Sequence, residues 1–318
     1  MDLIYTNSKK IDIGVLFDYS FDLSFGDSEN DFEITLTEDN DVLEYGSYIY
    51  IENTEYGGIV DMQKARTNGD SITYGGRTWH GILNCKVIQP AEGKDYLTIS
   101  GDANAVLSSL INRLGLAGLF VAAENESDVK ISNYQFKRYC KGYDGIRDML
   151  ASVKAKLKIE WIDRRVVLSA VPIVDYTETP IDDDIATLSV EIHRNKVNHL
   201  ICLGKGELAE REVIHLFADA FDNIVDSQYY FGLDEVAETY DNSNTENLRS
   251  DGISKFKELR NKDKAEISLT EDDELIYDIG DIVGASEIKS GVSVASAVCQ
   301  KIVKINNGAI SIEYKTGS

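Results

Sequence analysis

The chain has 318 residues, which at roughly 150 residues per domain predicts about two domains. Hydrophobic residues make up 43% and charged residues 27%, a balance typical of a chain that folds around a core rather than staying disordered. Its 55 acidic and 32 basic residues give a net charge of -23, which disfavours a protein that holds DNA, RNA or anionic lipid by neutralising phosphates.

The sequence carries no signal for membrane insertion or secretion. It lacks the roughly 18 consecutive apolar residues of a membrane span, and its first residues lack the basic and apolar regions of a signal peptide. Its 4 cysteines form no Cys-x-x-Cys pair and no dense framework of the secreted type, so we expect free, mostly buried thiols. With 3 prolines in all, Pro-rich linkers are not expected, and the domains should interlock.

Residues 1–99 are predicted to form an antiparallel β module. Apolar and polar residues alternate in segments 11–15, 32–36 and 48–50, which is the period of a half-buried strand. A hairpin is predicted at Asn68-Gly69, because both central residues of a two-residue hairpin turn take positive φ and Asn-Gly tolerates it.

From about residue 101 the apolar period changes from two to 3.6. Asp102 is predicted to cap a helix that Gly115 ends, and Asp144 is predicted to cap a second one. A hairpin is expected to follow over 158–171, with its turn at 163–165. The sequence therefore predicts a small α/β unit inserted between β segments.

The second half returns to strands after an acidic segment over 174–184, which we expect to be an exposed crossing between domains. Strands are predicted at 188–192 and 197–203. A helical interruption is then predicted over about 232–261, including a capping box from Ser243 to Glu246. Residues 265–318 are predicted to be strands again.

The two ends of the chain repeat a pattern. A glycine-led strand at Gly46, an Asn-Gly pair and a strand ending at Tyr74 recur late in the chain as Gly280, Asn307-Gly308 and Tyr314. Unrelated β hairpins can share these features, since Asn-Gly turns and Ile, Val and Tyr strands are common. If the repeat is real, the chain holds two similar barrels.

The potential metal ligands gather in one region only. In a strand His193 and His199 would share a face while Cys202 points the other way, and no spacing that includes His215 matches a paired zinc motif. We predict no metal and no cofactor.

Other candidate sites also favour structural interpretations. The segment 204–206 lacks a phosphate-binding loop layout, 291–295 lacks the second glycine of a nucleophile elbow, and 241–246 lacks the glycine of a calcium loop. Trp79 and Trp161 lie in strand contexts and are predicted to be core. We predict no catalytic, cofactor-binding or metal-binding residue, and no enzymatic activity.

Three segments of the sequence are distinctive: the string from Ser71 through Gly76-Arg77-Thr78-Trp79 to Leu83, the segment 198–204 and the segment 277–284. These segments resemble a tail protein family of siphophages and Gram-positive prophages. Such proteins are similar to the baseplate hub of contractile tails and to the hub portion of type VI secretion spikes. The resemblance implies an α+β, mainly β fold with two tube-like antiparallel β-barrel domains, an α/β insertion and a helical insertion.

The resemblance also implies a domain map and an assembly. The first barrel module is expected at 1–100, completed by strands near 185–205, with the α/β insertion at 101–180 and the second barrel module at 181–318. In that family three chains form a trimeric ring with pseudo-sixfold symmetry, which joins the tail tube protein to the central spike or tail-tip protein beside other baseplate proteins. We expect assembly in the bacterial cytoplasm, a final location in the virion or tail particle, and DNA only as passing cargo.

Two other functions remain open on the sequence. A tail protein that binds cell-surface carbohydrate would need exposed aromatic platforms, against which the two tryptophans in apolar strands argue mildly. A cell-wall hydrolase would need carboxylates in a cleft with separated pKa values.

Overall fold

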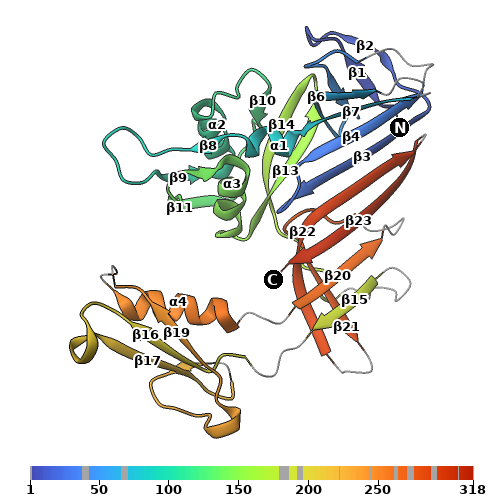
Figure 1. The fold of residues 1–318 in the computed structure, drawn as a ribbon. Helices are drawn as coiled ribbons and strands as arrows, with labels where there is room; N and C mark the ends of the chain where they lie inside the picture. The colour runs from blue at the N-terminus through green and yellow to red at the C-terminus, as the bar shows by residue number, and fades with distance from the viewer. Residues whose placement is uncertain are drawn as a thin grey trace. The chain divides into compact units, whose positions relative to one another are not determined.

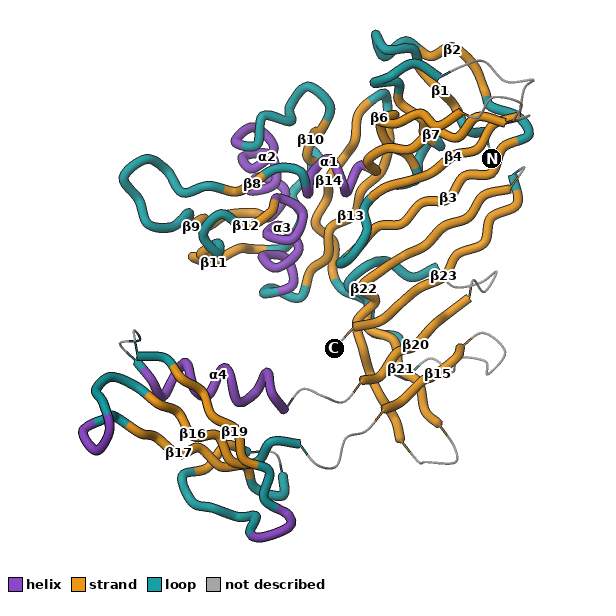
Figure 2. The backbone as a smooth tube through the Cα atoms, in the orientation of Figure 1, coloured by secondary structure: helices purple, strands orange, loops and turns teal. Residues whose placement is uncertain are grey.

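The structure is a computed structural model. It describes residues 2–37, 43–65, 71–178, 186–191, 196–221, 223–243, 245, 247–260, 264–270, 276–287, 292–306 and 308–317. The fold is mainly β, and the chain divides into two compact units, one of residues 1–188 with 266–318 and one of residues 189–265 (Figures 1 and 2). The predicted fold class, mainly β with an α/β part and a helix-bearing part, is confirmed.

The larger unit is built on one long sheet whose first part comes from the N-terminal residues. Alternating apolar residues of these strands, such as Phe32, Ile34 and Leu36, face a common core. In sheet order the strands are β3 (Tyr19–Gly26), β4 (Asp31–Thr37), β7 (Ser71–Thr78), β6 (Gly57–Ala65), β5 (Tyr48–Tyr50), β1 (Ile4–Thr6) and β2 (Asp12–Val15).

The second part of the same sheet comes mostly from the C-terminal residues. Its strands in order are β15 (Ala186–Glu191), β20 (Lys264–Thr270), β23 (Ala309–Gly317) and β22 (Val292–Asn306), with β21 (Ile282–Glu287) also on β22. Strand β22 pairs antiparallel with β3, from Gln300 opposite Gly26 to Asn306 opposite Ser20, and so joins the two parts (Figure 1).

The predicted repeat is real at the level of single hydrogen bonds. The Gly46 amide donates to the carbonyl of Val60 and the Gly280 amide to that of Val298, each over 2.8 Å. Both glycines have positive φ, +82° and +103°. The ladders β6·β7 and β22·β23 each carry a register shift immediately after that valine.

A buried tyrosine completes each copy. The hydroxyl of Tyr74 accepts a hydrogen bond from the Leu43 amide, and that of Tyr314 accepts one from the Tyr277 amide. The meander β5–β6–β7 therefore corresponds to β21–β22–β23, and β3–β4 occupy the places of β15–β20. The turns at 66–70 and Asn307 lie outside the described residues, but the strands that they join pair as the Asn-Gly signals predict.

The expected α/β part is present, with a core that includes Leu110, Ile146 and Trp161. It begins at residue 79 rather than 101, so the prediction of strands over the whole of residues 1–99 is wrong at its end. The Asp102 side chain accepts from the amides of Asn104 and Ala105, as expected of the cap. Its elements are α1 (Trp79–Asn84), β8 (Val87–Ile88), β9 (Thr98–Asp102), α2 (Ala103–Arg113), β10 (Phe120–Ala122), β11 (Lys130–Gln135), β12 (Cys140–Lys141), α3 (Gly142–Ala151), β13 (Ala155–Ile162) and β14 (Arg165–Pro172).

Two local predictions in this region have different outcomes. The cap at Asp144 is wrong, because α3 begins two residues earlier, where Gly142 lies so close to the Leu83 carbonyl that a Cβ would come within 2.5 Å. Asp144 instead lies in the first turn, where the helix dipole favours a carboxylate. The hairpin β13·β14 is confirmed, with Asp163 and Arg164 both at positive φ in its two-residue turn.

The smaller unit is a sheet with one helix packed on it. Leu200 and Cys202 of the sheet and Phe256 of the helix form its core. Strand order is β18 (Ile224–Val225), β17 (Val213–Ala218), β16 (His199–Leu203) and β19 (Ala237–Asp241), and the helices are η1 (Leu208–Glu210), η2 (Gly232–Asp234) and α4 (Leu248–Arg260).

The helical prediction for this unit needs correction at its start. Residues 237–241 form β19, which pairs parallel with β16, so among the described residues of the predicted range 232–261 only η2 and α4 are helical. Residues 237–241 are a strand because they pair with a parallel strand far away in the sequence, and local periodicity does not reveal such a partner. Glu246 of the predicted capping box lies outside the described residues, and the side chain of Asn247 accepts from the Ser250 amide.

In the large sheet the pairing of the described strands follows an open path and does not close into barrels. The two tube-like barrels and their domain boundaries therefore stay predictions. Strand β16, within the range expected to complete the first module, pairs with β17 and β19.

Candidate functional site

The string that carried the family resemblance forms the junction between β7 and α1. Gly76 lies where a Cβ would come within 1.8 Å of the Ile59 carbonyl oxygen, so this position requires glycine. Arg77 makes a two-point ion pair with Asp61 across the β6·β7 ladder. The Thr78 hydroxyl accepts from the Gly81 amide and caps α1. These residues build the fold and carry no reactive group.

A buried ion network lies behind this junction. Lys301 of β22 has a side chain 2% exposed, and its Nζ lies 2.8 Å from Oε1 of Glu55. Nε2 of His80 lies 3.4 Å from the other oxygen of Glu55. These side chains, with Tyr143, line a cavity of about 310 Å³ between the sheet and the α/β insertion.

The charges of this network follow from its burial. Burial alone would raise the pKa of Glu55, but the charge and hydrogen bond of Lys301 together with the interactions of His80 outweigh it and lower that pKa to about 2. Burial lowers the pKa of His80, so the imidazole is neutral at pH 7, stacked 4.2 Å from the ring of Phe25. A carboxylate whose charge is held by a lysine is unsuited to general base catalysis, and the network is best explained as structural.

These shifts predict an acid-sensitive fold. In the folded protein the pKa values of His80 and Glu55 both lie below the ordinary values of 6.5 and 4.5. Each group therefore makes its full contribution to the free energy of unfolding when the pH is above its ordinary pKa. This contribution is lost as the pH falls below the ordinary pKa of each group, first for His80. We expect the free energy of unfolding to fall between pH 7 and pH 5, by at most about 1.4 kcal/mol per pH unit for this one proton. Tryptophan fluorescence in urea measures it, and an unchanged pH slope in His80→Phe would contradict the assignment.

A second buried cluster ties the α/β insertion to the C-terminal strands. Nζ of Lys156 donates to Asp278 and to both carboxylate oxygens of Asp281, each over 2.7 Å. Asp281 is fully buried and also accepts from the amides of Val174 and Asp278. Every member has a partner, so this cluster too is structural.

The predicted histidine cluster is only partly formed. Nδ1 of His199 lies 2.6 Å from Glu235 and Nε2 lies 2.8 Å from Nδ1 of His215, on the sheet face opposite α4. Cys202 is buried in the core under α4, as its strand parity predicted. His193 lies outside the described residues.

We expect no metal requirement. Among the residues that the structure describes, no group of three or more His, Cys, Asp or Glu side chains is arranged to hold a metal ion. Thermal unfolding should therefore be the same with and without a chelator, and a fall of several degrees in the midpoint with the chelator would contradict this prediction.

The four thiols are free, but only Cys202 is fully buried, so the expectation of mostly buried thiols is wrong. Cys140 and Cys299 are partly covered, whereas Cys85 is exposed at the end of α1. Both tryptophans are buried as predicted, but Trp79 begins helix α1 and does not lie in a strand. Among the described helices, none combines the length and the apolar character needed to cross a membrane.

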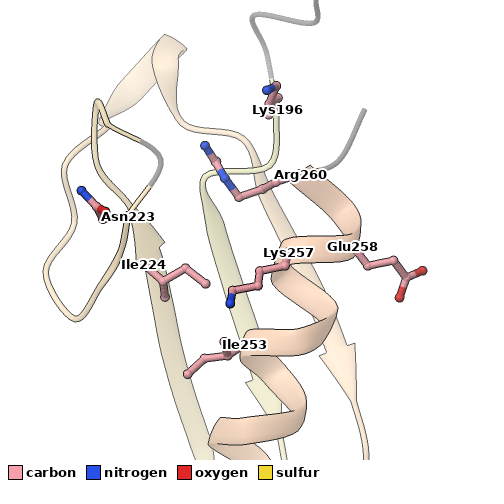
Figure 3. A pocket seen from close by; sticks show the side chains of 7 residues that line it. All are labelled: Lys196, Asn223, Ile224, Ile253, Lys257, Glu258 and Arg260. Atoms are coloured by element: carbon pink, nitrogen blue, oxygen red, sulfur yellow. The ribbon is translucent and has the colours of Figure 1, made fainter. Parts of the chain in front are cut away.

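The smaller unit carries a basic groove that sequence reasoning missed. It has a volume of about 770 Å³ and a floor that includes Ile224 and Ile253. Lys196, Lys257 and Arg260 surround it, while Glu258 points away (Figure 3). The only local signal was the three-residue spacing of Lys257 and Arg260 on one helix.

Large apolar side chains are also exposed elsewhere on both units. Ile11 and Ile13 beside or within the edge strand β2 are 52% and 51% exposed. In the smaller unit Phe221, Phe231 and Leu233 are 85%, 63% and 104% exposed.

Solved structures that resemble this chain over its whole length are phage tail proteins. The tail protein from Neisseria meningitidis matches with a TM-score of 0.53 and 11% identity, over 100% of this chain and 96% of that one. The 43 kDa tail protein of prophage MuSo2 from Shewanella oneidensis matches with a TM-score of 0.58 and 10% identity, over 100% and 98%. The chain has the fold of phage tail proteins.

The same fold occurs in a baseplate. A chain of the phage P2 baseplate in its activated conformation matches with a TM-score of 0.50 and 11% identity, over 99% of this chain and 98% of that one. No protein-family model and no curated protein sequence matches the chain. The expectation of a fold like that of tail and baseplate hub proteins is confirmed.

Proposed function

We propose that the protein is a structural hub subunit in the tail of a phage, prophage or phage-derived contractile particle. Three copies form a ring with pseudo-sixfold symmetry, which joins the tail tube to the central spike or tail tip. The observation that carries this proposal is the whole-chain likeness to tail and baseplate proteins, with no large part left over on either side. Fold alone does not fix function, so the repeat within the chain supplies the second support.

The repeat explains how a trimer can match a sixfold tube. Each chain contains two equivalent meanders, β5–β6–β7 and β21–β22–β23, with the same glycine turn and the same buried tyrosine. Three chains with two such modules each give about six similar wall elements. The α/β insertion, whose Leu110 and Leu114 are buried in its own core, would then lie outside the ring wall.

The charge of the chain fits a conduit for DNA as passing cargo. With a net charge of -23, a ring wall built from this chain is expected to be acidic, and it would repel phosphate rather than hold it. Lys301 and Lys156 are each paired with carboxylates of the same chain, which supports a structural role without enzymatic activity.

Cryo-electron microscopy of the assembled tail tests the proposal. We expect density for three copies at the tube end, with the two modules of each chain related by a rotation of about 60°. A single copy per tail, or two modules without this rotation, would contradict it.

A further inference from the structure

The two modules of the chain can be aligned residue by residue at their outer strands. In the first module Gln63 of β6 lies opposite Tyr74, and in the second Lys301 of β22 lies opposite Tyr314. In both ladders a register shift lies at the same place before this pair. Met62 is the first paired residue after the shift in β6, and Gln300 is the first after the shift in β22. Residues 62–65 of β6 therefore correspond to residues 300–303 of β22.

These corresponding segments have different surroundings. In the second module, residues 300–306 pair antiparallel with β3, and Gln300, Lys301 and Val303 are buried. In the first module, residues 62–65 are all exposed, and among the described strands they pair only with β7. Strand β5 occupies the outer side of β6 only at residues 57–59. The edge of β6 that matches the β22·β3 junction is therefore open.

The other half of that junction is also present twice. Strand β3 is the outer strand of the order β3–β4–β7, and β15 is the outer strand of the corresponding order β15–β20–β23. The two orders align because Tyr74 lies opposite Ile34 of β4 and Tyr314 lies opposite Leu269 of β20. On its side away from β20, β15 has no partner among the described strands. Each chain thus has one completed junction, β22·β3, and one open copy of each half.

We propose that residues 62–65 of β6 pair antiparallel with β15 of a neighbouring copy, which repeats between chains the β22·β3 junction made within each chain. This rests on the proposed ring function and names its interface. The contact is heterologous, since β6 of one copy meets β15 of the next, and such contacts close into a ring when the rotation allows it. Three copies then have six equivalent junctions, three internal and three between chains. Pairing also removes two open edges that would otherwise invite aggregation.

Paired cysteines test this contact in a background free of the natural cysteines. Lys64 corresponds to Ile302, whose partner across the internal junction is Ser24. Lys64→Cys is combined with single cysteines placed in turn along β15, and the assembled protein is oxidised. We expect disulfide bonds between chains when the β15 cysteine lies at the position opposite residue 64 or at a position next to it. Linked dimers and trimers should then appear on a denaturing gel.

Two controls make the result decisive. Ile302→Cys with Ser24→Cys should form the same bond within one chain and so report the equivalent geometry. Lys64→Cys combined with Ile13→Cys should form no disulfide bond, because Ile13 lies in β2, the strand at the other edge of the sheet. Linkage of Lys64→Cys to β2, or to no position of β15 in a preparation where microscopy shows rings, would overturn the interface and leave the ring proposal standing. Absence of rings at any protein concentration and in the assembled tail would overturn both.

Discussion

Replacing Lys301 by methionine is expected to lower the free energy of unfolding of the larger unit by up to about 3–5 kcal/mol. The Lys301 side chain is 2% exposed, and its ammonium is the charge that balances the carboxylate of Glu55, whose side chain is 18% exposed. Methionine retains most of the side-chain volume but leaves that carboxylate without a counter-charge. Urea unfolding followed by tryptophan fluorescence measures the change, because Trp79 and Trp161 lie in the adjoining core.

A double-mutant cycle separates the charge from the packing. Adding Glu55→Gln to Lys301→Met removes the unpaired charge, so the double variant should be more stable than Lys301→Met alone. Lys304→Met is the matched control, because Lys304 is exposed on the same strand, and its effect should stay within about 0.5 kcal/mol. If the two single changes simply add, the pair does not carry the stability assigned to it.

Replacing Trp161 by alanine is expected to destabilise the larger unit by about 3–5 kcal/mol. Trp161 of β13 stacks on Trp79 of α1 at 5.0 Å and on Tyr50 of β5 at 4.3 Å between ring centroids. Its backbone amide and carbonyl also bond to the loop between β5 and β6, through Thr54 and Asn53. The change would leave a cavity where the α/β insertion meets the sheet.

Circular dichroism in urea measures this effect. Tyr96→Ala is a suitable control, because Tyr96 is 48% exposed and its loss should cost less than about 1 kcal/mol. Trp161→Phe should fall between the two, since it retains an aromatic ring. A loss as small as that of Tyr96→Ala would show that this aromatic cluster does not hold the insertion to the sheet.

The sequence by itself determined the features that depend on neighbouring residues. Asp102 caps α2 because its carboxylate reaches amides two and three residues ahead, and Gly115, at positive φ, follows the end of that helix. The repeat was visible because each module needs a glycine at its turn and a buried tyrosine at a fixed place, so Gly46 and Tyr74 recur as Gly280 and Tyr314.

The tertiary structure decided what depends on partners far away in the chain. Residues 237–241 became a strand because β16, about 38 residues earlier, offers a parallel edge, which outweighs a helical apolar period. The pair Glu55–Lys301 joins residues 246 positions apart, so no local pattern marks it. The open edges of β6 and β15 have the same origin, because a strand's own residues set its alternation while only the sheet decides which side lacks a partner.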